Sequence, residues 1–260
     1  MTALSTSGRL TVIGLGPGDA RLIAPLALEA LSQAQVVAGY ATYLELVPAQ
    51  LLSGKQIIST GMMGEVERCG AAIEAALSGA DTVVVSGGDA GVYGMAGLVV
   101  ELLEARGLLE RLNFQVLPGI PALAAAAALL GAPLTHDFAC VSLSDLLTPW
   151  ERIATRLTAA ASADFVLVLY NPRSRRREGL FSRALTIIGE FRSPDTPVGI
   201  VRQAWREGQT VTTLPLSTVS PSAVDMLTIV VVGNSQTRLA GKWMLTPRGY
   251  SGKYAMRERS

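Results

Sequence analysis

Short apolar runs alternate along the first half of the chain with longer segments in which apolar residues recur every three or four positions. The short runs cover residues 10–13, 36–38, 56–58, 83–85 and 114–117. Runs of this length that are rich in Val and Ile predict buried strands, and the longer segments between them predict amphipathic helices. Strands and helices that alternate in this way indicate an α/β fold with a mainly parallel sheet covered on both faces.

The second half of the chain predicts a second α/β unit with a different kind of sheet. Expected strands cover 138–143, 165–170, 197–202, 210–214 and 227–232, with helices at 121–130 and 180–188. Glu207-Gly208 lies between two of these strands, and such a pair is typical of an antiparallel hairpin. We therefore expect a mixed sheet in this half.

A further helix is predicted to start near Thr148. Thr148-Pro149-Trp150-Glu151 combines the spacing of a capping box with a proline at the first helical position. Ile153 and Leu157 then continue the buried face that Trp150 begins. We expect Thr148 to cap this helix.

The most breaker-rich point in mid-chain is Leu117-Pro118-Gly119-Ile120-Pro121. Prolines and glycines at this density indicate a hinge, so we expect two α/β domains, at 1–119 and 120–245. Residues 246–260 are expected to form a tail. Basic residues from Lys242 onward suggest that this end of the chain is weakly ordered.

Composition narrows the function classes. The 260 residues are 49% hydrophobic and carry a net charge of +1, so the chain lacks the overall field typical of nonspecific nucleic-acid or membrane-surface binders. Cys69 and Cys140 are too few for a disulfide framework and indicate a reducing compartment, the cytoplasm. No closely spaced Cys or His residues suggest a metal site. The charge-free run 112–135 is interrupted by proline and glycine, which leaves a helix of about 15 Å against the ~30 Å of a bilayer core.

A glycine-rich turn after the first strand partly resembles a nucleotide-binding motif. In Gly14-Leu15-Gly16-Pro17-Gly18-Asp19, a dinucleotide fingerprint would need glycine at position 19, where the Asp19 charge would oppose a pyrophosphate. No acid follows near position 35, and no Gly-Lys-Ser/Thr of a P-loop is present. A dinucleotide-dependent oxidoreductase remains the alternative from another class.

The stretch Gly87-Gly88-Asp89-Ala90-Gly91-Val92-Tyr93-Gly94 follows the predicted strand 83–85 directly. Glycines allow positive φ and let a ligand lie against the main chain. Loops at the carboxyl ends of strands hold the ligands in open α/β sheets. We therefore expect a ligand site here, although a tight strand-to-helix connection is the structural alternative.

Four stretches in this order and spacing resemble the tetrapyrrole methylase family. They are the glycine turn 14–19, the loop 88–94, the hinge 117–121 and Thr228-Ile229-Val230-Val231-Val232-Gly233. Within the family, the stretches 38–40, 61–66, 142–150, 169–174 and 246–250 resemble the branch that methylates precorrin-3B at C17. The resemblance implies two α/β domains with a cleft between them, S-adenosylmethionine as methyl donor and a homodimer. It also implies ring contraction of the tetrapyrrole. From the charge balance and the interrupted apolar run, we expect no nucleic-acid or membrane partner.

The resemblance further implies residues that contact the donor. These are Gly88, Asp89, Val92, Tyr93, Ala122, Leu143, Tyr170, Asn171, Gln203, Ala204 and Thr228. A sulfonium donor carries no phosphate and needs main-chain oxygens and apolar slots, which the loop 88–92 can supply.

Candidates for chemistry and substrate binding are fewer. Ring contraction should need proton transfer, for which Asp89, His136 and Asp145 are the candidates. A structural hydrogen bond for His136 and a turn role for Asp145 are the alternatives. A substrate with several carboxylates calls for arginines, and Arg173, Arg175 and Arg176 lie just past a strand end, unless that loop is merely solvated. Whether the substrate carries cobalt stays open, as do another methylase of the family and a noncatalytic tetrapyrrole carrier.

Overall fold

The computed structural model describes residues 7–61, 63–173 and 179–254. The chain divides into two compact units, Met1–Ala122 and Leu123–Ser260. This division falls close to the boundary expected after residue 119. Each unit is built around one five-stranded sheet.

The first unit contains a fully parallel sheet. Its strands are β1 (Arg9–Gly14), β2 (Val36–Tyr40), β3 (Gln56–Thr60), β4 (Thr82–Ser86) and β5 (Asn113–Leu117). Their spatial order is β3-β2-β4-β1-β5, and every pairing is parallel. The predicted parallel sheet is thus confirmed.

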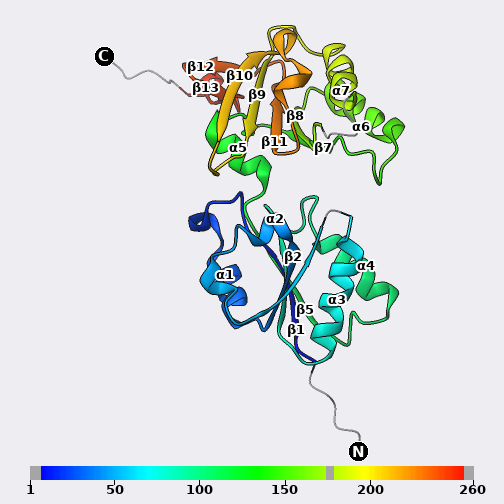
Figure 1. Cartoon of the computed structure of the whole chain (residues 1–260). Coiled ribbons are helices and arrows are strands. Elements are labelled where there is room, and N and C mark those ends of the chain that lie inside the picture. The colour runs from blue at the N-terminus through cyan, green and yellow to red at the C-terminus, as the bar shows by residue number, and fades with distance from the viewer. Residues whose placement is uncertain (1–6, 62, 174–178, 255–260) are drawn as a thin grey trace, which may run out of the picture. The chain divides into compact units, whose positions relative to one another are not determined.

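Helices cover both faces of this sheet (Figure 1). α1 (Pro25–Gln33) and α2 (Ala41–Leu44) lie on one face, and α3 (Glu65–Leu77) and α4 (Ala96–Ala105) lie on the other. Alternate strand residues enter separate cores, since Val12 and Val84 pack toward α3 and α4 while Ile13 and Val85 pack toward α1. Short 3-10 turns at Ala20–Leu22 and Ala49–Leu51 complete the connections.

The neighbouring strands β1 and β4 send their chains to opposite faces of the sheet. β1 leads to α1 on one face, and β4 leads to α4 on the other. In open α/β sheets the crevice between two such strands is where ligands bind, at the carboxyl ends. The topology therefore marks the loops after Gly14 and Ser86.

The second unit has a mixed sheet with order β10-β9-β11-β8-β7. Its strands are β7 (Phe138–Ser142), β8 (Val166–Tyr170), β9 (Pro197–Arg202), β10 (Thr210–Pro215) and β11 (Thr228–Val232). β7 and β8 are parallel, and the remaining pairs are antiparallel. The hairpin predicted around Glu207-Gly208 joins β9 to β10, so the expected mixed sheet is confirmed.

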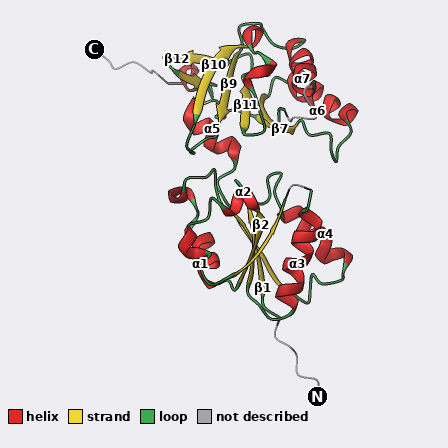
Figure 2. Cartoon of the chain, in the orientation of Figure 1, coloured by secondary structure: helices red, strands yellow, loops and turns green. Residues whose placement is uncertain are grey.

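Helices also flank both faces of this second sheet (Figure 2). α6 (Trp150–Ser162) and α7 (Leu180–Gly189) share one core with alternate residues of the strands. α5 (Ala122–Leu130) covers the other face, where the side chain of Leu130 lies against Gly199. A Cβ at Gly199 would stand 2.5 Å from Leu130, so glycine is what permits this close approach.

A small third sheet was not predicted. β6 (Gly131–Ala132), β13 (Trp243–Leu245) and β12 (Arg238–Ala240) form it. The weak order expected from Lys242 onward is therefore wrong for residues 243–245, which belong to a sheet. Met244 and Thr246 are fully buried, and Thr246 Oγ1 lies 2.8 Å from Thr237 Oγ1. Strands of two or three residues are too short to show a periodicity.

The second unit also contains short 3-10 turns, at Leu216–Thr218, Pro221–Ala223 and Tyr250–Gly252. Residues 255–260 lie outside the described part of the chain.

The predicted cap of α6 is wrong. The helix begins at Trp150, with Pro149 rather than Thr148 at the N-cap and no side-chain hydrogen bond to the cap. The Pro149 carbonyl instead accepts from the amides of Arg152 and Ile153. Pro149 keeps an extended ψ of 144°, so the helical turn starts one residue later than the motif suggests.

Candidate functional site

Three loops meet at the carboxyl edge of the first sheet. The loop after β1 and the loop after β4 are joined by a two-residue antiparallel bridge. Gly16 N donates to Gly88 O at 3.0 Å, and Gly88 N donates to Gly16 O at 2.8 Å. The two glycine-rich motifs identified in the sequence thus form one structure.

Asp89 connects the loop after β4 to itself and to the loop after β5. Its Oδ1 accepts from Gly91 N at 2.8 Å and from Val92 N at 3.2 Å. Its Oδ2 accepts from Gly119 N at 2.9 Å. A carboxylate that accepts three amide hydrogen bonds holds the backbone in place, so these contacts give Asp89 an organising role.

Glycine is required where these loops touch. A Cβ at Gly119 would lie 2.3 Å from Gly88 O, and a Cβ at Gly14 would lie 2.5 Å from the same oxygen. Gly88 itself has φ +67°, a backbone conformation that is strained for any residue with a side chain. The glycines therefore let three main chains approach at the topological switch point.

The remaining expected donor contacts of the first unit surround this junction. Val92 is partly buried, and Tyr93 is 54% exposed with φ 54°. Ala122 begins α5, and its amide is 3.6 Å from the Cβ position of Gly88. The first unit thus brings Gly88, Asp89 and Ala122 together.

At the end of the Gly14–Asp19 turn, an acidic side chain occupies the position that a pyrophosphate would need. The Asp19 carboxylate already accepts from Arg21 N at 2.9 Å, which is the amide that an anion would use. It is also paired with the Arg21 guanidinium, with Nη2 2.6 Å from Oδ2. The Arg21 side chain lowers the pKa of Asp19 to about 2, so Asp19 is ionised at neutral pH. These contacts are consistent with the sequence argument against a dinucleotide fingerprint at this turn.

Strand register gathers the expected residues of the second unit at one edge of its sheet. Thr228 pairs with Arg202, and Ser142 pairs with Tyr170. The carboxyl ends of β7, β8 and β9 and the amino end of β11 therefore share this edge. The residues expected there are Leu143, Tyr170, Asn171, Gln203, Ala204 and Thr228.

Hydrogen bonds fix the two parallel strands at this edge. Leu143 N donates to Tyr170 O at 2.9 Å, and Asn171 Nδ2 donates to Ser142 Oγ at 3.0 Å. Tyr170 Oη accepts from Leu123 N at 3.0 Å, near the start of α5. The ends of β7 and β8 are therefore rigidly tied.

Strained backbone concentrates at the same edge. Asn171, Gln203 and Trp205 have φ of 51°, 49° and 60°. Non-glycine residues in this region cost about 1–3 kcal/mol and cluster at ligand sites. Two of these three were expected to contact the donor, which supports a ligand site at this edge.

Sequence reasoning missed an ion pair and a tryptophan here. Asp225 accepts from Arg202 Nε at 2.7 Å and from Thr228 Oγ1 at 2.7 Å. Burial acts to raise the pKa of Asp225, but hydrogen bonds led by that from Arg202 outweigh it, and the pKa is lowered. Trp205 Nε1 donates to Ala125 O at 3.1 Å and ties the β9–β10 loop to α5. No local motif signals these contacts, because both join segments that are far apart in the sequence. The register of β9 and β11 creates the ion pair.

The two remaining catalytic candidates lie at opposite ends of β7. Asp145 is exposed in the loop that follows the strand, at the edge just described. His136 precedes the strand, and its Nδ1 accepts from Asp137 N at 2.8 Å. Because β7 spans about 17 Å, the structure does not bring His136 to the residues around Asn171.

The expected substrate arginines fall partly outside the described chain. Arg173 follows β8 and donates from Nη1 to Pro221 O at 3.3 Å. Arg175 and Arg176 lie in the segment 174–178, outside the described residues.

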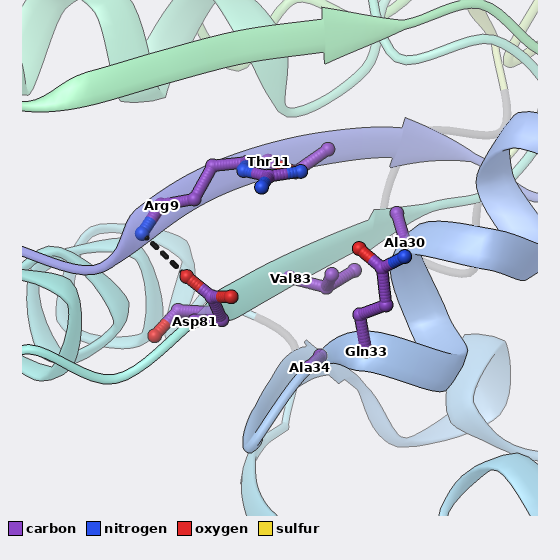
Figure 3. A pocket seen from close by; sticks show the side chains of 8 residues that line it. Arg9, Thr11, Ala30, Gln33, Ala34, Asp81 and Val83 are labelled. Atoms are coloured by element: carbon purple, nitrogen blue, oxygen red, sulfur yellow. Dashed lines mark hydrogen bonds between the residues drawn. The ribbon is translucent and has the colours of Figure 1, made fainter.

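A small cavity lies at the opposite edge of the first sheet (Figure 3). Its volume of about 10 Å³ suits one water molecule. Arg9 N donates to Asp81 Oδ1 at 2.8 Å beside it, where β1 and β4 begin. This cavity is too small for an organic ligand and is separate from the glycine junction.

No group of three or more His, Cys, Asp or Glu side chains in the described residues could hold a metal ion. No helix in the same residues is long and apolar enough to cross a membrane.

Comparison with known families gives a match over most of the chain. The sequence model of the Tetrapyrrole (Corrin/Porphyrin) Methylases matches residues 9–220.

Curated relatives match over nearly the whole chain. A probable cobalt-factor III C(17)-methyltransferase from Salmonella typhimurium is 48% identical over 242 residues, covering 93% of this chain and 99% of the relative. The cobalt-factor III methyltransferase from Priestia megaterium is 47% identical over 253 residues, and this chain spans only 47% of its length. A precorrin-3B C(17)-methyltransferase from Sinorhizobium sp. is 36% identical, with 95% and 98% covered.

Solved structures of similar proteins share the fold. The methyltransferase CobJ superposes with a TM-score of 0.89 at 40% identity, covering 93% of this chain and all of that one. A uroporphyrin-III C-methyltransferase from Thermus thermophilus, complexed with S-adenyl homocysteine, gives a TM-score of 0.64 at 25% identity, with 87% and 97% covered.

Proposed function

The chain belongs to the tetrapyrrole (corrin/porphyrin) methylase family, and from this premise we propose that it methylates C17 of a corrin precursor with S-adenosylmethionine as donor. The observation that carries the proposal is the 48% identity to a C(17)-methyltransferase of nearly the same length. The matching residues include the glycine junction of the first unit. The proposed class of enzyme is therefore a C-methyltransferase.

We further propose that the substrate carries cobalt, as in cobalt-factor III. Relatives named for cobalt-factor III are 47% and 48% identical to this chain, whereas the relative named for precorrin-3B is 36% identical. Precorrin-3B, the metal-free macrocycle, is the second candidate. Each of these two macrocycles carries several carboxylate side chains, whereas S-adenosylmethionine carries a single carboxylate.

The chemistry of the glycine junction suits a sulfonium donor. Such a donor lacks phosphate, and the anion-binding amide at Arg21 is already taken by Asp19. The loop 87–94 is instead a glycine-rich main chain at the switch point, ordered by Asp89. We propose that Gly88, Val92 and Tyr93 contact the donor and that Asp89 holds their loop.

In the second unit, the strained and hydrogen-bonded edge supports a similar role. We propose that Leu143, Tyr170, Asn171, Gln203, Ala204 and Thr228 contact the donor. Ala122, at the start of α5, belongs to the same proposal. The positive φ of Asn171 and Gln203 supports it most directly, because backbone strain is retained where it serves a ligand.

Bound S-adenosylmethionine would supply an activated methyl group. The protein's part in the transfer is to align the acceptor carbon and exclude water, so orientation can lower much of the barrier. Ring contraction, which we also propose, needs a proton-transfer group. Asp145 is the better candidate for that group, because Asp89 is occupied by three amides and His136 lies at the other end of β7. Arg173 is the described candidate for binding a substrate carboxylate.

Two assays test the proposal. Purified protein with cobalt-factor III and methyl-labelled S-adenosylmethionine should give a product whose label is on C17, read by mass spectrometry and NMR. Calorimetry should show binding of S-adenosylhomocysteine and no binding of NADH. Label at another carbon would refute the C17 assignment, and a methylated product without contraction would refute the contraction alone.

We also propose that the protein works as a homodimer in the cytoplasm. The family resemblance supports the dimer, and a chain with only Cys69 and Cys140, too few for a disulfide framework, suits a reducing compartment. Sedimentation of the purified protein measures its mass, and a monomer would contradict the first part.

A further inference from the structure

Arg68 is a buried cation at the carboxyl edge of the first sheet. It lies in the first turns of α3, and only 2% of the residue is exposed. Among the described residues it forms no ion pair with a carboxylate. Charged side chains are rarely buried in this way without a partner.

The guanidinium of Arg68 has one good hydrogen bond and two deficient nitrogens. Nη1 donates to Thr60 Oγ1, at the end of β3. Nη2 is directed at the thioether of Met95, with a distance of 3.7 Å to Sδ, and thioether sulfur is a weak acceptor. Nε is buried and has no hydrogen-bond partner at all. The deficient nitrogens are Nε and Nη2, which together form one edge of the guanidinium fork.

Other arginines of the chain show what this edge normally binds. Arg21 uses the same two nitrogens on Asp19, with Nε 3.0 Å from Oδ1 and Nη2 2.6 Å from Oδ2. Arg106, Arg192 and Arg202 also lie within ion-pair distance of an Asp or Glu. Arg68 is therefore a side chain whose free edge has the shape and charge that match a carboxylate.

The position of Arg68 connects it to the proposed donor loop. Met95 directly follows Gly94, where a Cβ would lie 2.5 Å from Ala90 O and 2.6 Å from Asp89 O. The loop is thus too tightly folded to shift freely, but the Met95 side chain is flexible and only partly buried. Rotation of that side chain would release Nη2 beside the loop 87–94, and the unbonded Nε lies on the same edge of the guanidinium.

We propose that Arg68 binds a ligand carboxylate through Nε and Nη2, in place of the Met95 thioether. The inference rests on the proposed function, in which both ligands carry carboxylates. One source is the amino-acid carboxylate of the donor, and the other is an acidic side chain of the tetrapyrrole. In either case Arg68 is a binding residue that the sequence motifs did not single out.

The experiment measures two affinities in the full-length protein. Calorimetry gives the dissociation constant of S-adenosylhomocysteine, and fluorescence or absorbance titration gives that of cobalt-factor III. Arg68→Met removes the charge and keeps the bulk, and Arg68→Lys keeps the charge but loses the fork. Arg106→Met is the matched control, because Arg106 also joins α4 to α3 but through an exposed pair with Glu74.

Arg68→Met should weaken one of the two ligands about tenfold to a hundredfold, which is what a lost charge-assisted hydrogen-bonded pair implies. Weaker S-adenosylhomocysteine alone assigns the donor carboxylate, and decarboxylated S-adenosylhomocysteine should then bind wild type and Arg68→Met equally. Weaker cobalt-factor III alone assigns the macrocycle. Arg68→Lys should lie between, and Arg106→Met should match wild type.

Stability separates binding from a structural role. Because Arg68 has no carboxylate partner among the described residues, Arg68→Met should unfold at the same or a higher urea concentration than wild type. A lower unfolding midpoint with both affinities unchanged would make Arg68 structural and overturn the inference. If wild type binds both ligands and Arg68→Met binds them with the same affinities, the inference is overturned while the proposed function stands. Failure of wild type to bind either ligand would instead refute the proposed function, and the inference with it.

Discussion

The Oδ2 atom of Asp89 lies 2.9 Å from the amide nitrogen of Gly119, so one carboxylate joins the loops that follow β4 and β5. These loops leave strands that are separated in the sheet by β1. The loop after β1 is held between them by the bridge from Gly16 to Gly88. The edge that we propose to bind the donor therefore depends on Asp89.

Asp89→Asn should weaken this junction. An amide offers only one acceptor oxygen, so at least one of the bonds from Gly91, Val92 and Gly119 is lost. A lost bond of this kind costs about 1–3 kcal/mol. We expect a lower urea midpoint and weaker S-adenosylhomocysteine binding, measured by unfolding and by calorimetry. Wild-type affinity in Asp89→Asn would show that the loop keeps its shape without the carboxylate.

Gly119→Ala should damage the same junction by steric overlap. The new Cβ would lie 2.3 Å from Gly88 O and 2.8 Å from Gly14, both main-chain atoms that cannot rotate away. We expect loss of S-adenosylhomocysteine binding together with lower stability.

Gly97→Ala is the matched control for that variant. Gly97 lies in α4 with nothing within 4 Å of its Cβ position, so alanine should stabilise the helix by up to about 1 kcal/mol. Calorimetry and thermal unfolding of both variants check the pair. Equal behaviour of Gly119→Ala and Gly97→Ala would contradict the close approach of the three loops.

Arg192→Met should lower stability without affecting the donor site. The buried Arg192 guanidinium donates to the carbonyls of Ala161 and Phe165 at 2.7 Å and of Gly233 at 3.1 Å. Burial lowers the pKa of Arg192, while the Asp164 carboxylate acts in the opposite direction. Removing the side chain leaves these carbonyls unpaired, so we expect a loss of about 3 kcal/mol in the free energy of unfolding.

Two comparisons sharpen the Arg192 prediction. Gly233 follows β11, whereas Thr228 begins it, so the folded Arg192→Met protein should bind S-adenosylhomocysteine like wild type. Arg183→Met is the control, since Arg183 is exposed and stacks on Trp150, 4.2 Å from the ring centroid. Loss of this cation–π contact should lower the free energy of unfolding by at most about 1 kcal/mol. Equal losses in the two variants would remove the special role of Arg192.

Acid should weaken the edge at Thr228 through Asp225. The pKa of Asp225 in the folded protein is lowered, mainly by Arg202, against an unfolded value of about 3.9. A lowered pKa contributes stability that is present above about pH 4 and is lost as the pH falls through the folded pKa. Urea unfolding of wild type and Asp225→Asn should therefore differ at neutral pH and converge in acid. Arg202→Met should shrink the same difference, and a gap independent of pH would contradict the prediction.

Local patterns determined most of the elements and part of the site. The apolar run at β4 and the helical spacing of α3 were readable because strand and helix periodicities are short-range properties of the chain. The glycine loop 87–94 was readable as a candidate ligand site, because glycines directly after a buried strand let a ligand lie against the main chain. The antiparallel hairpin was readable because the pair Glu207-Gly208 between two short strand patterns is also a local signal.

Tertiary structure decided which of these local features act together. The contact of Gly14, Gly88 and Gly119, and the pairing of Arg202 with Asp225, depend on the register of strands far apart in the sequence. The separation of His136 from Asn171 and the burial of Arg68 depend on the same packing. A repeat of two or 3.6 residues states which face is buried but carries no information on which distant strand lies beside it. That pairing is settled only when the whole core packs. For the same reason, the unbonded guanidinium edge of Arg68 could be recognised only in the folded structure.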